Sequence, residues 1–314
     1  MGGLGFCFPA GKVFGQMPAG ANSMLLSESF TPKIWMEAFR SSHATMPSAD
    51  KAFWQSFSRQ PATVVASSEG VARVLTLPAP GVEAFKWTVA QRLVPEINDR
   101  MADAIRNDRS VSGFATLSAQ DPQILREAER SLSQLRLSGL TLGANRGVRL
   151  DDRRFWPLYE FAEAAGAPLY FPAAYTAVAG DAPYGALDRA GVLTGASADS
   201  GAHANQLIFG GVLDAFPKLN VILARMGDGA ATRYGQLVGN QEHLVASGSR
   251  GPERSIEDYF KQNIYLTTSD VRSNETVAFL NQVIGKGRTL PIHGAVLADG
   301  RLIRLGDAPH EIRS

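Results

Sequence analysis

Several classes of protein are excluded by what this sequence lacks. Cys7 is the only cysteine among 314 residues, so no disulfide can form within the chain, as is typical of a reducing compartment. No apolar run approaches the roughly 18 residues of a membrane span. The first residues also lack the basic segment followed by an apolar one that marks a secretory signal. We therefore expect a cytoplasmic protein.

The sequence has no excess of charge of either sign. It carries 31 lysines and arginines against 30 aspartates and glutamates, with no long run of either kind. This balance predicts neither a nucleic-acid partner nor a membrane partner. Hydrophobic residues make up 45% of the chain, which is enough to bury a sizeable core.

Short apolar runs alternate with helix-like segments along most of the chain. The helix-like segments carry clear boundary signals: Asp121-Pro122 opens one, Gly166 closes the next, and a third runs over residues 205–216 until Pro217. The apolar runs are continuous, as expected for strands buried on both faces. The expected strands are residues 33–38, 71–77, 113–117, 139–143, 167–171, 220–225, 264–268 and 288–292.

Eight strands alternating with helices predict an α/β fold, a closed (β/α)8 TIM-type barrel, although periodicity alone leaves an open parallel sheet as the alternative. We expect a flexible N-terminal arm over residues 1–31, the barrel over 32–293 and a separate tail over 294–314. In a barrel of this kind the functional residues lie where the strands end.

Four segments carry a resemblance to a known family, and they occur in the family's order. They are residues 96–122 ("EINDRMADAIRNDRSVSGFATLSAQDP"), 150–172 ("LDDRRFWPLYEFAEAAGAPLYFP"), 210–229 ("GGVLDAFPKLNVILARMGDG") and 255–269 ("SIEDYFKQNIYLTTS"). Together they resemble the amidohydrolase-related decarboxylases, and most of all the 2,3-dihydroxybenzoate and γ-resorcylate decarboxylases. The resemblance implies an amidohydrolase-like barrel that releases CO₂ from an aromatic or enoic carboxylate with the help of a divalent metal such as zinc or manganese.

The sequence departs from the family at the metal-ligand positions that the resemblance implies. With "KIWMEAF" taken as the first strand, the first two positions fall on Glu37 and Phe39, and the His-Pro pair that ends the fifth strand reads Phe171-Pro172. Arg225 replaces the histidine after the sixth strand, while an acidic partner remains in Asp228. Only Glu37 would then be left to bind a metal, and one carboxylate does not make a catalytic site that needs about three protein ligands. We expect no cofactor.

The same positions suggest roles for a reaction without metal. Arg225 would hold a substrate carboxylate or pair with a neighbouring acid, and Glu37, Asp228 or His293 would move protons. His293 lies at the end of the eighth strand, beside Gly294, which stands near the family's last aspartate ligand. The hydroxyls of Thr268 and Ser269, together with the rings of Phe39 and Phe171, would contact the substrate. His203 is expected to be a helix residue.

The resemblance predicts a carboxy-lyase, and two alternative functions stay open. The chain could be a metal-free cyclase, hydratase or hydrolase of secondary metabolism, or it could be an inactive partner of an intact paralogue. We expect a small aromatic or enoic carboxylate as ligand, and a homo-oligomer or a paralogue as protein partner. In place of the family's last helix the tail predicts a hairpin turning at Asp299-Gly300. This tail is either a true replacement or an artefact of the gene model.

Overall fold

Eight parallel strands, arranged in sequence order, form the sheet at the centre of the molecule. The computed structural model describes residues 23–27, 30–42, 71–78, 81–83, 85–108, 111–143, 148–172, 198–227, 233–249, 251–267, 274–285 and 288–290. The strands are β1 (Ser23–Ser27), β2 (Val71–Leu75), β3 (Val111–Ser118), β4 (Gly139–Gly143), β5 (Leu169–Phe171), β6 (Val221–Leu223), β7 (Ile264–Thr267) and β8 (Thr289–Leu290).

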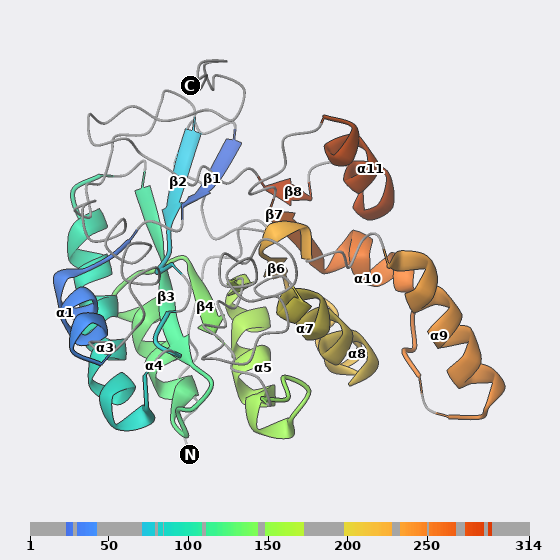
Figure 1. Ribbon diagram of the computed structural model, residues 1–314, viewed down its shortest axis with the longest axis horizontal. Helices are drawn as coiled ribbons and strands as arrows, with labels where there is room; N and C mark the ends of the chain where they lie inside the picture. The colour runs from blue at the N-terminus through green and yellow to red at the C-terminus, as the bar shows by residue number, and fades with distance from the viewer. Residues whose placement is uncertain are drawn as a thin grey trace, which may run out of the picture.

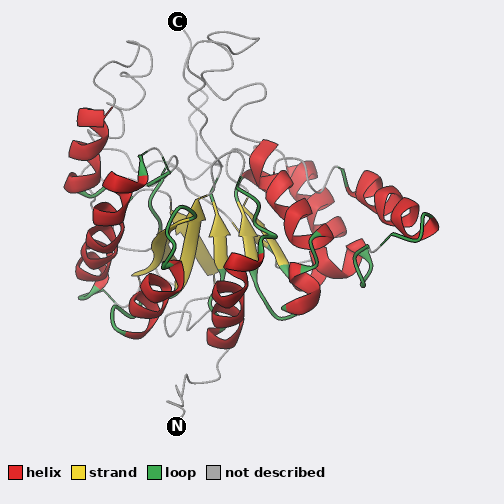
Figure 2. Cartoon of the chain, turned by 90° about the horizontal axis from the view of Figure 1, so that it is seen from below, coloured by secondary structure: helices red, strands yellow, loops and turns green. Residues whose placement is uncertain are grey.

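The sheet curls on itself, so that Cα atoms of β8 come within 8 Å of those of β1. Helices lie around the outside of the curled sheet (Figures 1 and 2). They are α1 (Lys33–Ser42), α3 (Trp87–Ile105), α4 (Ile124–Ser133), α5 (Trp156–Ala165), α7 (Ala198–Phe209), α8 (Val212–Ala215), α9 (Tyr234–Ala246), α10 (Ile256–Gln262) and α11 (Asn274–Ile284), with short 3₁₀ turns η1 (Arg153–Phe155) and η2 (Arg225–Gly227). The expected TIM-type (β/α) barrel is confirmed.

Alternate residues of each strand supply two separate cores. The outward-facing residues pack against the helices and form the larger cluster, which includes Ala115, Leu117, Leu140 and Leu142. The inward-facing residues form a smaller cluster in the barrel interior: Leu26, Val74, Phe114, Tyr170, Ile222, Ala224, Tyr265 and Leu290. Burial on both faces explains why the strands read as continuous apolar runs.

The first strand lies elsewhere than the sequence suggested. Residues 33–38, expected to be a strand, belong to α1, because Trp35, Met36 and Phe39 are its buried residues and follow the spacing of one helix face. The true first strand is β1, which pairs in parallel with β2 inside the segment expected to be a flexible arm. The expected arm boundary at residue 31 is therefore wrong.

Two other expectations concern helices and the tail. The helix expected over residues 205–216 is two helices, α7 and α8, because Gly211 adopts a left-handed conformation with φ of 74° between them. The left-handed Gly166 ends α5 as expected. The hairpin at Asp299-Gly300 and the tail over 294–314 lie outside the described residues. Among the helices that the structure describes, none combines the length and the apolar character needed to cross a membrane.

Candidate functional site

Because all the strands are parallel, their carboxyl ends meet at one end of the barrel. The last residues of the first five strands show part of what the sequence places there: Ser27, Leu75, Ser118, Gly143 and Phe171. Only hydroxyl and apolar groups appear in this set. Ionisable groups at these five strand ends must therefore come from side chains that reach in from the loops.

Glu83 is such a side chain, and sequence reasoning missed it. It follows β2 in the turn at 81–83, and its Oε1 accepts hydrogen bonds from the Ser118 hydroxyl (2.6 Å) and the Ala119 amide (3.0 Å). Its Oε2 accepts a third from Nε2 of Gln120 (3.1 Å). Burial raises the pKa of this carboxyl, and the hydrogen bonds only partly oppose the shift.

Glu83 extends over the end of β4. A Cβ atom on Gly143 would lie 2.7 Å from Cγ of Glu83, so the glycine leaves the room that the glutamate fills. Ser118 and Gly143 are register partners on β3 and β4, and they lie on the inward face of the sheet, two residues beyond Thr116 and Thr141. A partly buried carboxylate therefore lies at the mouth of the barrel. The sequence does contain a signal for this residue. Glu83 comes directly after "TLPAPGV", the stretch that follows the second strand.

Glu37 and Phe39 are not at a strand end, which contradicts their expected place at the barrel mouth. Because their segment is helical, Glu37 projects from α1 with 57% of its side chain exposed, 3.6 Å from the Lys33 ammonium. Phe39 is buried between α1 and the rest of the core, with its ring 5.5 Å from that of Trp35 and 6.2 Å from that of Phe85. Neither residue is in position to meet a substrate at the mouth.

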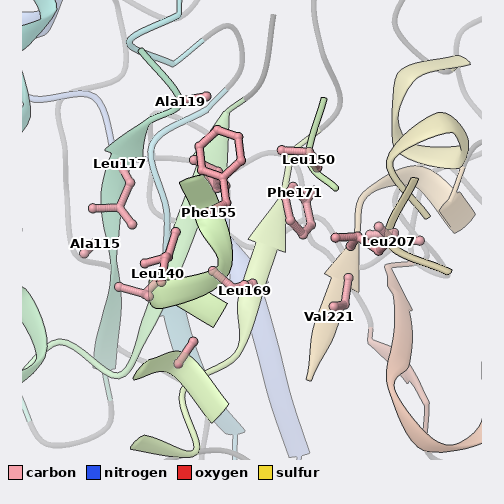
Figure 3. Packing of buried hydrophobic residues seen from close by; sticks show 14 of the residues in the cluster. Ala115, Leu117, Ala119, Leu140, Leu150, Phe155, Leu169, Phe171, Leu207 and Val221 are labelled. Atoms are coloured by element: carbon pink, nitrogen blue, oxygen red, sulfur yellow. The ribbon is translucent and has the colours of Figure 1, made fainter. Parts of the chain in front are cut away.

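Phe171 ends β5 as expected, but it faces outward. It belongs to the core between sheet and helices, and Figure 3 shows it beside Leu150 and Leu207. Its ring centroid lies 5.6 Å from that of His203 on α7. The inward positions of β5 are those of Tyr170 and, two residues on, Pro172, since side chains alternate along a strand. The expectation that Phe171 lines a substrate pocket is therefore wrong.

His203 is a helix residue, as expected, and it is only 6% exposed. Its Nδ1 is buried and has no hydrogen-bond partner among the described residues. Burial lowers its pKa to about 4, so the imidazole is neutral at pH 7. Its place on the outer side of β5 separates it from the barrel mouth.

Arg225 follows β6 directly. Its backbone opens η2, in which Met226 has a left-handed φ of 58°. The structure thus places residue 225 at the carboxyl end of a barrel strand, where the sequence predicted it. Four other predicted site residues lie outside the described residues: Asp228, Thr268, Ser269 and His293.

Several of the metal-ligand positions implied by the resemblance, among them Asp228 and Gly294, lie outside the described residues. With β1 ending at Ser27, the first of the two family positions falls on Ser27 in place of Glu37, and the second falls on Ser29, outside the described residues. Neutral hydroxyls are poor substitutes for the carboxylate and imidazole ligands that hold such ions. Glu83 already accepts three hydrogen bonds. Within the described ranges, no three His, Cys, Asp or Glu residues come together as a metal-binding group.

Comparison with known proteins agrees with this architecture. The amidohydrolase family model matches residues 54–247. A γ-resorcylate decarboxylase of Polaromonas sp. strain JS666 is 28% identical over 228 residues, which is 69% of this chain and 70% of the relative.

Solved structures of decarboxylases share the fold. The 5-carboxyvanillate decarboxylase of Sphingomonas paucimobilis superposes with a TM-score of 0.69 at 26% identity, over 86% of this chain and 87% of its own. A dihydroxybenzoic acid decarboxylase of Polaromonas sp. JS666, solved with bound manganese and the inhibitor 2-nitroresorcinol, superposes with a TM-score of 0.68 at 24% identity, over 87% and 86%. The chain thus belongs to the amidohydrolase family, and it is similar to decarboxylases of known structure within that fold.

Proposed function

We propose that this protein is a non-oxidative carboxy-lyase that acts on an aromatic or enoic carboxylate without a divalent metal. Its membership of the family and the decarboxylases among its relatives support the reaction class. The observation that carries the metal-free part is the arginine directly after β6, at the end of the barrel where β1 ends in serine. A fixed positive charge there favours an anion and disfavours a cation.

Arg225 is the proposed anchor for the substrate carboxylate. A guanidinium presents N–H groups in a planar fork that matches a carboxylate with two parallel hydrogen bonds. This pairing orients the substrate, and it leaves the ring carbon that bears the carboxylate open to protonation.

The reaction needs one proton donor. A proton added to the ring carbon makes that carbon tetrahedral, and the C–C bond then breaks so that its electron pair returns to the ring and CO₂ leaves. Asp228, three residues after Arg225, and His293 are the proposed proton-transfer residues. Glu37 is withdrawn from this role because it lies on the exposed side of α1.

Kinetics of arginine variants test the proposal. CO₂ release from 2,6-dihydroxybenzoate and 2,3-dihydroxybenzoate is measured for the wild type, R225K and R225A. Loss of a charge-assisted bidentate pair should lower kcat/KM by about a hundredfold in R225A, with R225K in between. R100A, which changes an exposed arginine on α3, should match the wild type.

Unchanged turnover in R225A would rule out the proposed anchor. Saturable binding of both acids without any CO₂ release would contradict the carboxy-lyase function. It would favour the alternative function, that of a metal-free cyclase, hydratase or hydrolase.

A further inference from the structure

The inner face of β4 is unusual because two of its three residues have no side chain. Gly139, Thr141 and Gly143 point into the barrel, while Leu140 and Leu142 point to the helices. The Phe114 ring fills the space over Gly139, where an added Cβ would lie 2.5 Å from Cε1 of the ring. Glu83 fills the space over Gly143 in the same way. Thr141 is therefore flanked by an aromatic ring on the inner side and a carboxylate on the mouth side.

Thr116 of β3 is the register partner of Thr141, so two hydroxyl-bearing side chains lie next to each other on this face. Both residues are only 3% exposed. Neither Oγ1 has a hydrogen-bond partner among the described residues. Buried hydroxyls almost always have a partner, because leaving one unpaired costs the desolvation of the group. Two such adjacent hydroxyls offer hydrogen bonds to a polar group between them, from a water molecule or a ligand.

The chemistry of this pair specifies what it can bind. Each threonine hydroxyl donates one hydrogen bond and accepts others, so a single O–H group can accept from one threonine and donate to the other. A carboxylate is disfavoured, because the Glu83 carboxyl lies over the neighbouring position of β4. The Phe114 ring on the other side favours contact with an aromatic ligand.

We propose that Thr116 and Thr141 form a subsite for the hydroxyl group of a phenolic ligand, which a water molecule occupies when no phenol is bound. The proposal rests on the proposed function only in taking the ligand to be aromatic. It makes the β3–β4 wall the one that binds the ring hydroxyl, and it assigns Glu83 the role of closing that subsite toward solvent.

The test uses resorcinol, which has hydroxyl groups and no carboxylate, so its binding does not depend on decarboxylation. The dissociation constant is measured by calorimetry for the wild type, T141V, T116V and T141S. Valine keeps the shape of threonine and removes the hydroxyl, so T141V and T116V should bind resorcinol about tenfold more weakly. T141S, which keeps the hydroxyl, should bind within a factor of about three of the wild type.

Two controls test whether the effect is specific to these two threonines and to the hydroxyl of the ligand. S133A removes an exposed hydroxyl on α4 that donates to the Glu129 carbonyl, away from the barrel interior, and should leave resorcinol binding unchanged. Benzoate, which has no hydroxyl, should distinguish poorly between the wild type and T141V.

The outcomes decide between three situations. A selective loss of resorcinol binding in the valine variants supports the subsite. Valine variants that bind resorcinol as the wild type does, or that gain thermal stability because unpaired hydroxyls have been removed, overturn it. A wild type that does not bind resorcinol, with valine variants that lose thermal stability, would also overturn it and leave a site for water only.

Discussion

Asn98 shows how a single side chain can complete the sheet. Beyond Gly113, β3 has no further pairing with β2, and the amide of Asn98 reaches from α3 to meet the exposed backbone. Its Oδ1 accepts from the Thr116 amide (2.7 Å), and its Nδ2 donates to the Thr116 carbonyl (3.0 Å) and to Glu127 (2.7 Å). The residue therefore joins two helices to the strand that carries the proposed subsite.

Removing this amide should destabilise the fold markedly. N98A leaves a buried N–H and a buried C=O of Thr116 unpaired, which should lower the free energy of unfolding by about 3 kcal/mol. Urea denaturation measures the change. Q91A, on an exposed site of the same helix, should change it by less than about 0.5 kcal/mol. A similar small change in N98A would contradict this account of the β2–β3 gap.

His203 predicts how stability depends on pH. Its pKa is lowered to about 4 from the ordinary 6.5, so between these values the unfolded chain binds more protons than the folded one. Stability is then fully present above pH 6.5 and falls as the pH is lowered, by up to about 3 kcal/mol at pH 4.

A variant without this one histidine, H203L, isolates the contribution. Unfolding free energies of wild type and H203L, measured between pH 4 and 7, should differ in slope, with the variant less sensitive to acid. Parallel curves would show that the imidazole is not buried in its neutral form.

At the scale of elements, the strands from residue 71 onward were predictable, and the start of the chain was not. Runs such as "GLTLG" and "IYLTT" are flanked by helices with clear ends, so both their existence and their order could be read. Residues 33–38 were predicted to be a strand because "KIWMEAF" is as apolar as a strand. In the structure, the buried residues Trp35, Met36 and Phe39 have the spacing of one helix face. β1 has only three apolar residues and follows a glycine- and alanine-rich stretch, so its short run gave too little signal.

The glycines of β4 make a second prediction at this scale. G139A should destabilise the protein by about 2 kcal/mol, because the new methyl group would overlap the Phe114 ring. G239A makes the same change in the exposed middle of α9, where nothing lies within 4 Å, and should stabilise it by about 0.5–1 kcal/mol. Thermal unfolding of the two variants should therefore shift in opposite directions. A G139A protein as stable as the wild type would refute the close packing of Phe114 on β4.

At the scale of the whole molecule, the sequence predicted the barrel and its family but not the composition of its mouth. The barrel follows from the order of the elements. The mouth depends on where each strand ends and on which way the last side chain points, and an error in the first strand moved two predicted site residues onto a surface helix. Phe171 was placed on the correct strand and the wrong face, while Glu83 reaches the mouth from a loop that carries no strand pattern.

We propose a decarboxylase-type barrel whose mouth would recognise its ligand with Arg225 and hydroxyl groups in place of a metal. The most direct test is the rate of CO₂ release from 2,6-dihydroxybenzoate before and after removal of metal with a chelator, with elemental analysis of both samples and a third sample given Mn²⁺. The account predicts equal rates in all three, with metal content after chelation well below one ion per chain. Release that stops on chelation and returns only with stoichiometric Mn²⁺ would contradict it.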